Sequence, residues 1–388
     1  MNIQNRPNPI ARAGEIGAEI DAAVDEIERT RRFPEPLLGR LHESRLFRMV
    51  LPRSAGGDQS EPATYVAGLE EIARHDASVA WNTFAINSSS LIAAYLEPDA
   101  SHAIYADPRA AIAWGPPNAS RARAVDGGYR LTGQWDFCSG CRQASWLGAH
   151  CPVIEADGSL RLNQRGKPVV RTLLFPATEA TLLDNWQTIG LRGTSSESYR
   201  VDDLFIPEAF SASREDPALR RERGPLYAFT IQGLYAAGVA GVALGIARAM
   251  LSEFMALASR KSPRGLARLA DSAVLQSDVA RAEARLGSAR AYLIETLTTI
   301  HAQANDVAPI EMAERARVRL AATNAIHGAI EVADFAYKQA GVDAIFPGSP
   351  FERRFRDMHT LSQQIQSRGA HFEQVGQILL GVPPEVFL

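Results

Sequence analysis

The spacing of apolar positions divides the chain into three parts, and the first of them is helical. Over roughly the first hundred residues, apolar side chains recur every three or four positions, which is the period of an amphipathic helix. The stretches with this period are residues 14–31, 36–46, 65–73 and 78–96. The last stretch is almost entirely apolar or small, so we expect a deeply buried helix there. The pattern predicts a helical N-terminal domain over residues 1–108.

The period changes near residue 110. Tyr129, Leu131, Trp135 and Phe137 are interleaved with polar residues, as in a strand with one buried face. Residues 124–129 contain Gly127-Gly128 and predict a tight hairpin just before this strand. Further strand candidates are residues 146–155, 169–175 and 199–206. These segments predict a β-domain over residues 109–222.

The helical period returns in four long stretches, at residues 227–260, 271–303, 309–340 and 354–380. Short connections containing Pro and Gly separate them, which favours an antiparallel four-helix bundle over residues 223–388. The expected fold class is therefore mainly α with a central β-domain.

Composition narrows the function classes. The 388 residues carry 41 basic and 44 acidic side chains, a net charge of −3, so no basic excess points to nucleic acid. No uninterrupted run of 18 apolar residues is present, and the first 20 residues do not form a secretory signal pattern. Three cysteines make a disulfide framework improbable. We expect a cytoplasmic protein without a membrane span.

Two short motifs have structural interpretations that we favour over functional ones. The Gly-rich segment at residues 238–245 lies inside a predicted helix rather than between a strand and a helix, so it indicates close helix packing and not a dinucleotide loop. Cys138 and Cys141 form a C-x-x-C pair with Cys151 nearby, but a zinc site would need a fourth ligand, and His150 and Cys151 point to opposite faces of a strand. We expect no metal, and interpret the thiols as packing or site-lining groups.

Two other features keep both interpretations open. His359 follows Arg356-Asp357 in a predicted helix and could line a site or simply pack. A basic cluster, Arg260, Lys261, Arg264 and Arg268, joins the first two bundle helices. It could clamp a phosphate or could be a solvated loop.

Several stretches, in this order and spacing, resemble the acyl-CoA dehydrogenase family over nearly the whole chain. They are residues 52–57, 69–81, 133–140, 190–196, 201–207 and 349–357. The resemblance implies an acyl-CoA dehydrogenase-like fold with an N-terminal helical domain, a β-domain and a C-terminal four-helix bundle. It also implies a flavin, FAD or FMN, between the sheet and the bundle.

Two branches of this family differ in chemistry. Acyl-CoA dehydrogenases use a glutamate base, and their last helix usually runs into a Tyr-Glu-Gly-Thr stretch, which residues 363–371 lack. Residues 137–140 and 356–360 are more similar to the branch of two-component flavin-dependent monooxygenases. Those enzymes receive reduced flavin from a separate flavin reductase. The resemblance thus implies a monooxygenase. The alternatives are an acyl-CoA dehydrogenase-type oxidoreductase and a non-enzymatic assembly protein with the same fold.

The resemblance also assigns roles to residues. Trp135, Phe137, Cys138, Ser139, Thr194 and Ser196 would contact the flavin ring, and Arg260, Arg264 and Gln276 would hold its phosphate or adenosine part from an adjacent subunit of a homotetramer. Trp81, Asn82, Ser89 and Trp186 would face the substrate, and Cys138, Ser139, His359 and Gln364 would be the catalytic groups.

Three departures from the branch bear on the substrate. Ser89 and Gln364 stand where several hydroxylases have histidines, and Cys138 stands in the apparent place of a serine or threonine hydroxyl. A substrate that must first lose a proton is therefore disfavoured. An electron-rich small molecule, aromatic or heteroaromatic and indole-like, needs no such base, and neither does an amine or a sulfide.

Overall fold

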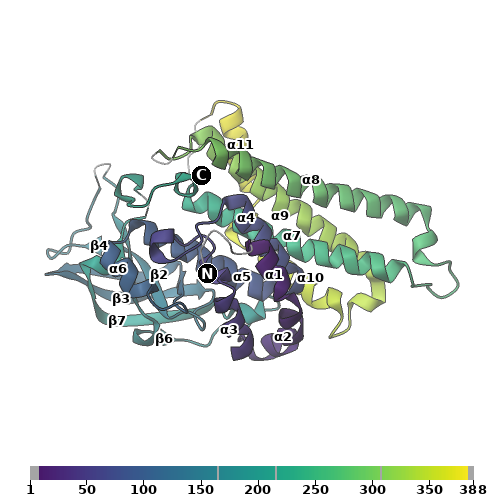
Figure 1. Ribbon diagram of the computed structural model, residues 1–388, viewed down its shortest axis with the longest axis horizontal. Helices are drawn as coiled ribbons and strands as arrows, with labels where there is room; N and C mark the ends of the chain where they lie inside the picture. The colour runs from purple at the N-terminus through teal and green to yellow at the C-terminus, as the bar shows by residue number, and fades with distance from the viewer. Residues whose placement is uncertain (1–7, 164–165, 215, 306–307, 383–388) are drawn as a thin grey trace.

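The three parts of the chain form three adjoining domains in the computed structural model (Figure 1), which describes residues 8–163, 166–214, 216–305 and 308–382. This confirms the predicted fold class. The N-terminal helices are α1 (Pro9–Glu15), α2 (Gly17–Thr30), α3 (Glu35–Glu43), α4 (Pro62–His75), α5 (Ala77–Ser90) and α6 (Pro98–Tyr105).

Two predicted helices are divided in a way that the apolar period did not indicate. The stretch expected at residues 14–31 begins earlier and is interrupted at Ile16, which leaves helical geometry at φ −99° and ψ 3° and separates α1 from α2. The stretch expected at residues 78–96 is α-helical only to Ser90 and continues as a 3-10 turn over Leu91–Tyr95. The hydroxyl of Ser90 donates to the carbonyl of Asn87, a local bond that competes with the regular helical pattern.

The central domain is one eight-stranded mixed sheet. Its strands are β1 (Ile112–Gly115), β2 (Pro117–Val125), β3 (Gly128–Cys138), β4 (Trp146–Ile154), β5 (Val170–Pro176), β6 (Thr181–Leu182), β7 (Glu197–Pro207) and β8 (Ser211–Ala212). The order is β6-β7-β3-β2-β4-β5-β8, with β1 parallel to β4. The predicted hairpin joins β2 to β3, and Gly127 takes the positive φ of 74° that its turn requires.

The C-terminal domain consists of α7 (Ile231–Ala258), α8 (Ala273–Gln303), α9 (Met312–Ala340), α10 (Pro350–Leu361) and α11 (Ala370–Leu379). The prediction of a single helix over residues 354–380 is wrong. Helix α10 ends at Leu361, the chain forms a 3-10 turn over Ile365–Ser367, and α11 follows. The side chain of Gln364 accepts a hydrogen bond from the backbone N–H of Gln366, which stabilises this break.

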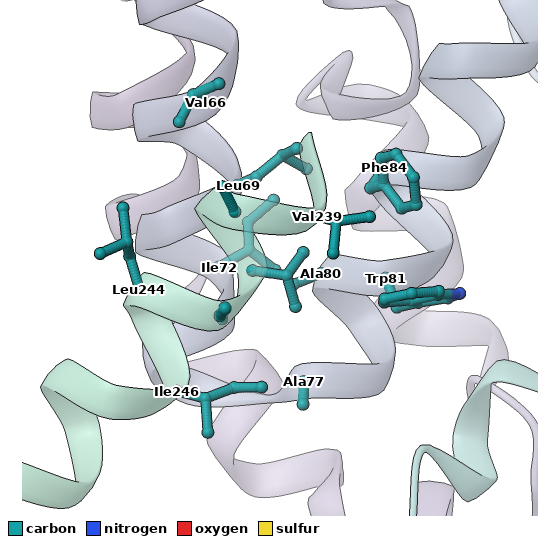
Figure 2. Packing of buried hydrophobic residues seen from close by; sticks show 14 of the residues in the cluster. Val66, Leu69, Ile72, Ala77, Ala80, Trp81, Phe84, Val239, Leu244 and Ile246 are labelled. Atoms are coloured by element: carbon teal, nitrogen blue, oxygen red, sulfur yellow. The ribbon is translucent and has the colours of Figure 1, made fainter. Parts of the chain in front are cut away.

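Helix α7 lies at the centre of the molecule. Gly238 and Gly245 face α5 and α4, where an added Cβ would overlap Phe84 or the carbonyl oxygen of Glu70. Helix packing is thus the role of the Gly-rich segment. By length and composition α7 could also cross a membrane, but 89% of its most apolar window is buried inside the protein, as expected of a core helix. Figure 2 shows the cluster of buried hydrophobic residues where α7 packs on α4 and α5. Trp81 of α5 lies at the edge of this cluster, with its ring nitrogen directed away from α7.

Candidate functional site

The end of β3 presents an aromatic ring to solvent. Phe137 has a positive φ of 56°, which is uncommon for a residue with a Cβ, and the pairing of β3 with β7 is irregular between Trp135 and Cys138. The side chain of Phe137 is 64% exposed, and its ring meets that of Trp186 edge-on at 6.2 Å between centroids. This part of the strand is therefore built to expose an apolar face.

Beside Phe137 lies a row of buried hydroxyl groups. The indole N–H of Trp81 donates to the hydroxyl oxygen of Ser139 at 2.9 Å. The hydroxyl oxygens of Ser139 and Ser196 are 2.6 Å apart, and those of Ser196 and Thr194 are 2.7 Å apart. We call these four residues the hydroxyl chain. They come from α5, from the end of β3 and from the loop before β7, and the sequence had singled out all four.

The loop over residues 186–196 holds one end of the hydroxyl chain. Its central peptide is that of Leu191, whose carbonyl accepts from the hydroxyl of Thr194 at 2.8 Å and from the indole N–H of Trp186 at 3.0 Å. Leu191 itself has a positive φ of 50°. A positive φ costs energy for a residue with a Cβ. The two side-chain hydrogen bonds to the Leu191 carbonyl hold the loop in this conformation, so we infer that the loop is rigid.

Asp357 of α10 secures this loop from the other side. Its carboxylate accepts from the backbone N–H of Leu191 at 2.6 Å, and its side chain is 2% exposed. Burial raises the pKa of Asp357 to about 7, and the nearby carboxylate of Asp76 adds to the effect. The sequence had drawn attention to Arg356-Asp357 only as neighbours of His359. Nothing local could show that Asp357 meets a residue 166 positions away.

Cys138 does not lie where the sequence placed it. Its thiol is fully buried in the hydrophobic core of the β-domain, in the same cluster as Trp135 and Cys141. Burial raises the pKa of this thiol well above its usual range, and Cys141 raises it further. Because side chains alternate along a strand, the hydroxyl facing outward belongs to Ser139, and the assignment of Cys138 to the flavin side is wrong. Trp135 is likewise a core residue, stacked on Tyr199 at 5.3 Å, and does not face the site.

His359 is directed away from the hydroxyl chain. Its Nε2 is 3.0 Å from a carboxylate oxygen of Asp334 on α9, and its ring packs on Phe355. Residues two positions apart on a helix point in nearly opposite directions, so Asp357 faces the loop while His359 faces the bundle. Within this subunit His359 therefore lies apart from the hydroxyl chain, and its catalytic role stays a prediction.

A second polar spot lies at the far side of α5. The phenol of Tyr235, on α7, hydrogen-bonds Gln364, and burial raises the pKa of Tyr235 to about 12. The Tyr235 ring meets Phe84 at 4.5 Å, and Phe84 meets Trp81 at 5.3 Å. Gln364 is thus linked to the hydroxyl chain through a row of aromatic rings.

The other residues predicted to face the substrate lie on α5. Asn82 and Ser89 are seven residues apart and so share one helix face, on which Ile86 approaches Gly140. Asn82 is fully buried, and neither its amide oxygen nor its amide nitrogen has a hydrogen-bond partner. An unpaired buried amide is costly and therefore marks a place where a ligand or water is expected.

The basic cluster is remote from the hydroxyl chain within one subunit. Figure 1 shows the connection between α7 and α8 at the end of the bundle farthest from the sheet. Arg260 and Arg264 are exposed there, and the side chain of Gln276 donates to the carbonyl of Ala270 at 2.8 Å. Within a single chain these residues do not join Phe137 and Ser139.

Neither of the two surface clefts is lined by Trp81, Asn82 or Ser89. One, of about 330 Å³, lies between Phe33 and Arg142, and the other, of about 260 Å³, lies between Trp146 and Phe205. Among the residues described, no group of three or more His, Cys, Asp or Glu side chains is arranged to hold a metal ion. The hydroxyl chain with exposed Phe137 is the strongest candidate site.

Comparison with known proteins assigns the chain to a family. The acyl-CoA dehydrogenase N-terminal domain matches residues 15–103, and the acyl-CoA dehydrogenase C-terminal domain matches residues 237–368. The indole-3-acetate monooxygenase of Pseudomonas putida is 30% identical, over 95% of this chain and 92% of its own length. The flavin-dependent monooxygenase oxygenase subunit HsaA of Rhodococcus jostii is 26% identical, over 87% and 88%.

Solved structures agree on the fold. XiaF from a Streptomyces species, in complex with FADH2 and glycerol, superimposes with a TM-score of 0.89 at 24% identity, covering 98% of this chain and 96% of that one. TdsC from Paenibacillus, with FMN and indole, gives 0.81 at 20% identity, covering 98% and 99%. The chain belongs to the acyl-CoA dehydrogenase family, in its branch of flavin-dependent monooxygenases. This confirms the resemblance found in the sequence and favours the monooxygenase over the acyl-CoA dehydrogenase alternative.

Proposed function

We propose that this protein binds a reduced flavin against Phe137 and Ser139 and uses O2 to oxygenate a small, indole-like aromatic molecule. The observation that carries the proposal is the hydroxyl chain, which ends beside the exposed ring of Phe137. A planar ring system could place its apolar face on the Phe137 ring and its polar edge at the Ser139 hydroxyl.

The residues present fit a flavin by two independent features. Phe137 leaves an aromatic face uncovered, next to a hydroxyl on a rigid strand end. The amide of Asn82 is buried without partners close to Gly140, which follows Ser139 directly. Unpaired polar atoms beside an uncovered ring suit a ligand with both apolar and hydrogen-bonding surface.

When bound in its reduced form, the flavin would supply the activation of O2. The protein's part is positioning and exclusion of water. Phe137 would cover one face of the ring, Ser139 would meet its polar edge, and Trp186, edge-on to Phe137, would face the substrate. The nearly all-buried helix α5 would keep water from the reacting atoms, which limits wasteful proton transfer.

We assign the substrate side to Trp81, Asn82 and Ser89 of α5, with Gln364 and Tyr235 as the polar group opposite. Support comes from the aromatic row between Trp81 and Tyr235 and from the absence of histidines at positions 89 and 364. A substrate that reacts without prior deprotonation, as an indole ring does, suits these side chains. The relative from Pseudomonas putida is named for an indole compound.

The assembly completes the proposal. We propose a cytoplasmic homotetramer in which Arg260, Arg264 and Gln276 hold the phosphate or adenosine part of the flavin bound by a neighbouring subunit. A flavin reductase would supply the reduced flavin. The support for a shared site is that Arg260 and Arg264 are exposed and distant from Phe137 in their own chain. The three unpaired buried cysteines fit a reducing compartment.

The test is oxygen incorporation. We expect that protein mixed with chemically reduced FAD or FMN, isotopically labelled O2 and indole or indole-3-acetate yields a product carrying one labelled oxygen by mass spectrometry. FAD and FMN should be compared side by side. Thioester substrates serve as the opposing control. Loss of the yellow colour of oxidised flavin on adding an acyl-CoA, with no labelled product, would contradict the monooxygenase proposal.

A further inference from the structure

Only one direction of the hydroxyl chain makes all of its hydrogen bonds at once. It contains four hydrogen-bond contacts, from Trp81 to Ser139, Ser139 to Ser196, Ser196 to Thr194, and Thr194 to the carbonyl of Leu191. The indole N–H and the three hydroxyls provide one proton each, so four protons serve four contacts. With no proton to spare, assigning one contact fixes all the others.

The contact at Leu191 makes that assignment. A carbonyl oxygen can only accept, so the proton of Thr194 points to Leu191. The proton of Ser196 must then point to Thr194, and the proton of Ser139 to Ser196. At the other end the indole of Trp81 can only donate, which agrees with the same direction.

Burial keeps water from supplying other partners. Thr194 is 0% exposed and Ser196 is 4% exposed, while Ser139 is the most open hydroxyl of the chain at 9%. Ser139 thus has its proton committed inward and one lone pair left over. Toward the exposed side, beside Phe137, it is an acceptor.

We propose that Thr194 is a positioning residue: by committing its proton to the Leu191 carbonyl, it makes Ser139 an acceptor toward the bound ligand. The inference rests on the proposed function, in which that ligand is a flavin. A reduced flavin carries a hydrogen on N5 and can donate to Ser139, whereas an oxidised flavin presents a bare lone pair there. The direction of the chain therefore discriminates between the two redox states of the ring.

Reversal of the chain is possible at the loss of one bond. For Ser139 to donate to an oxidised ring, Ser196 and Thr194 must turn as well, and the Leu191 carbonyl then loses the Thr194 hydroxyl and keeps the indole N–H of Trp186 and the backbone N–H of Thr194. One neutral hydrogen bond corresponds to roughly a three- to tenfold difference in affinity. Thr194→Val removes the proton that enforces the direction, so the preference for reduced flavin should fall by that factor.

The test measures the dissociation constants of oxidised and reduced FAD separately, the latter anaerobically, together with the midpoint potential of the bound flavin. In Thr194→Val we expect the ratio of oxidised to reduced dissociation constants to fall roughly three- to tenfold. A tenfold fall lowers the two-electron potential by about 30 mV. Thr194→Ser restores the hydroxyl and should restore both values.

Thr83→Val is the matched control. Thr83 is equally buried, lies on α5 two residues after Trp81, and its hydroxyl bonds only the Val79 carbonyl of its own helix at 2.8 Å. It should leave the ratio and the potential unchanged. A purely structural role for Thr194 would weaken both redox forms equally and leave the potential unmoved, which would overturn the inference while flavin binding stands. Absence of flavin binding in the unaltered protein would overturn the proposed function and this inference with it.

Discussion

At the scale of single residues, Asp357 joins two domains through a buried carboxyl group whose pKa is raised. It binds the N–H of Leu191 and lies near Asp76, whose carboxylate caps α5 by accepting from the N–H of Val79 at 2.9 Å. Burial opposes the ionisation of Asp357 and raises its pKa, and the nearby carboxylate of Asp76 raises that pKa further. Arg353 counters this only in part.

This junction predicts a pH dependence of stability. Because the folded-state pKa of Asp357 is about 7, above its unfolded value, the folded protein holds the proton more tightly. Its contribution to the free energy of unfolding is present at low pH and is lost as the pH rises from about 4 to about 7. The loss is on the order of 4 kcal/mol, from about 1.4 kcal/mol per pKa unit.

The side chain of Asp357→Asn cannot ionise. As the pH rises through this range, the free energy of unfolding of the variant should therefore increase relative to that of the unaltered protein. Denaturant unfolding of both proteins at several pH values measures the difference. A difference that stays constant from pH ~4 to pH ~7 would show that Asp357 is not the titrating group.

Cys138 offers a second prediction at this scale. Its thiol is 0% exposed among apolar side chains, so Cys138→Ser should lower the free energy of unfolding by roughly 1–3 kcal/mol, the range for a buried hydroxyl without a good partner. Flavin affinity should change little, because the thiol faces the β-domain core. A large loss of flavin affinity at unchanged stability would return Cys138 to the flavin side.

At the scale of elements, α7 is limited by how closely its neighbours approach. Gly245→Ala would push a Cβ into the carbonyl of Glu70 and into Ala73, both on α4. We expect it to lower the free energy of unfolding by roughly 1–3 kcal/mol, as overpacking does. Gly287→Ala on α8 meets no atom within 4 Å and should instead raise stability by about 0.5–1 kcal/mol. Equal effects of the two variants, by denaturant unfolding, would argue against close packing of α7.

The same elements show what sequence reasoning could reach. Regular periods located α2, α4 and β3 because each buries one repeating face, whereas α7 shows as a long apolar stretch that is buried on nearly all sides. The end of α10 at Leu361 was not predicted. The helix break depends on a hydrogen bond from the backbone N–H of Gln366 to the side chain of Gln364, and such a bond does not alter the spacing of apolar residues. The hydroxyl chain was named residue by residue from the family resemblance. Its direction, and the part of Asp357 and Leu191, depend on contacts between distant segments and needed the structure.

At the scale of the whole molecule, a tetramer needs an exposed apolar surface on each chain. The Gly- and Ala-rich part of α7 is already covered within one chain, so it calls for no partner. Large apolar side chains are instead exposed beyond the end of α9, where Val342, Ile345 and Phe346 are each close to 60% exposed. The adjoining α7–α8 connection is tied to this segment by Lys261, which binds the carbonyl of Ala340 at 2.8 Å. Exposed apolar clusters of this kind mark interfaces between subunits.

We therefore expect light scattering to give a mass near four times the 42.1 kDa of one chain. Phe346→Asp should shift the protein to smaller species, since a charge at a subunit interface must lose its hydration. Leu162→Asp, on the β-domain and 56% exposed, is the matched control and should not. A single-chain mass for the unaltered protein at micromolar concentration would rule out the tetramer and the shared flavin site.

The cysteines of this protein can report on the opening of its β-domain. Cys138, Cys141 and Cys151 are unpaired, at most 2% exposed, and all belong to the hydrophobic core of the β-domain. Cys141 lines the surface cleft of about 330 Å³, whereas a thiol reagent can reach Cys138 and Cys151 only when that domain opens, and the two helical domains contain no cysteine. The labelling rate of Cys138 and Cys151 under native conditions therefore measures the opening free energy of the sheet alone. Comparing that free energy with and without flavin would tell how much of the ligand's binding energy reaches the sheet rather than the bundle.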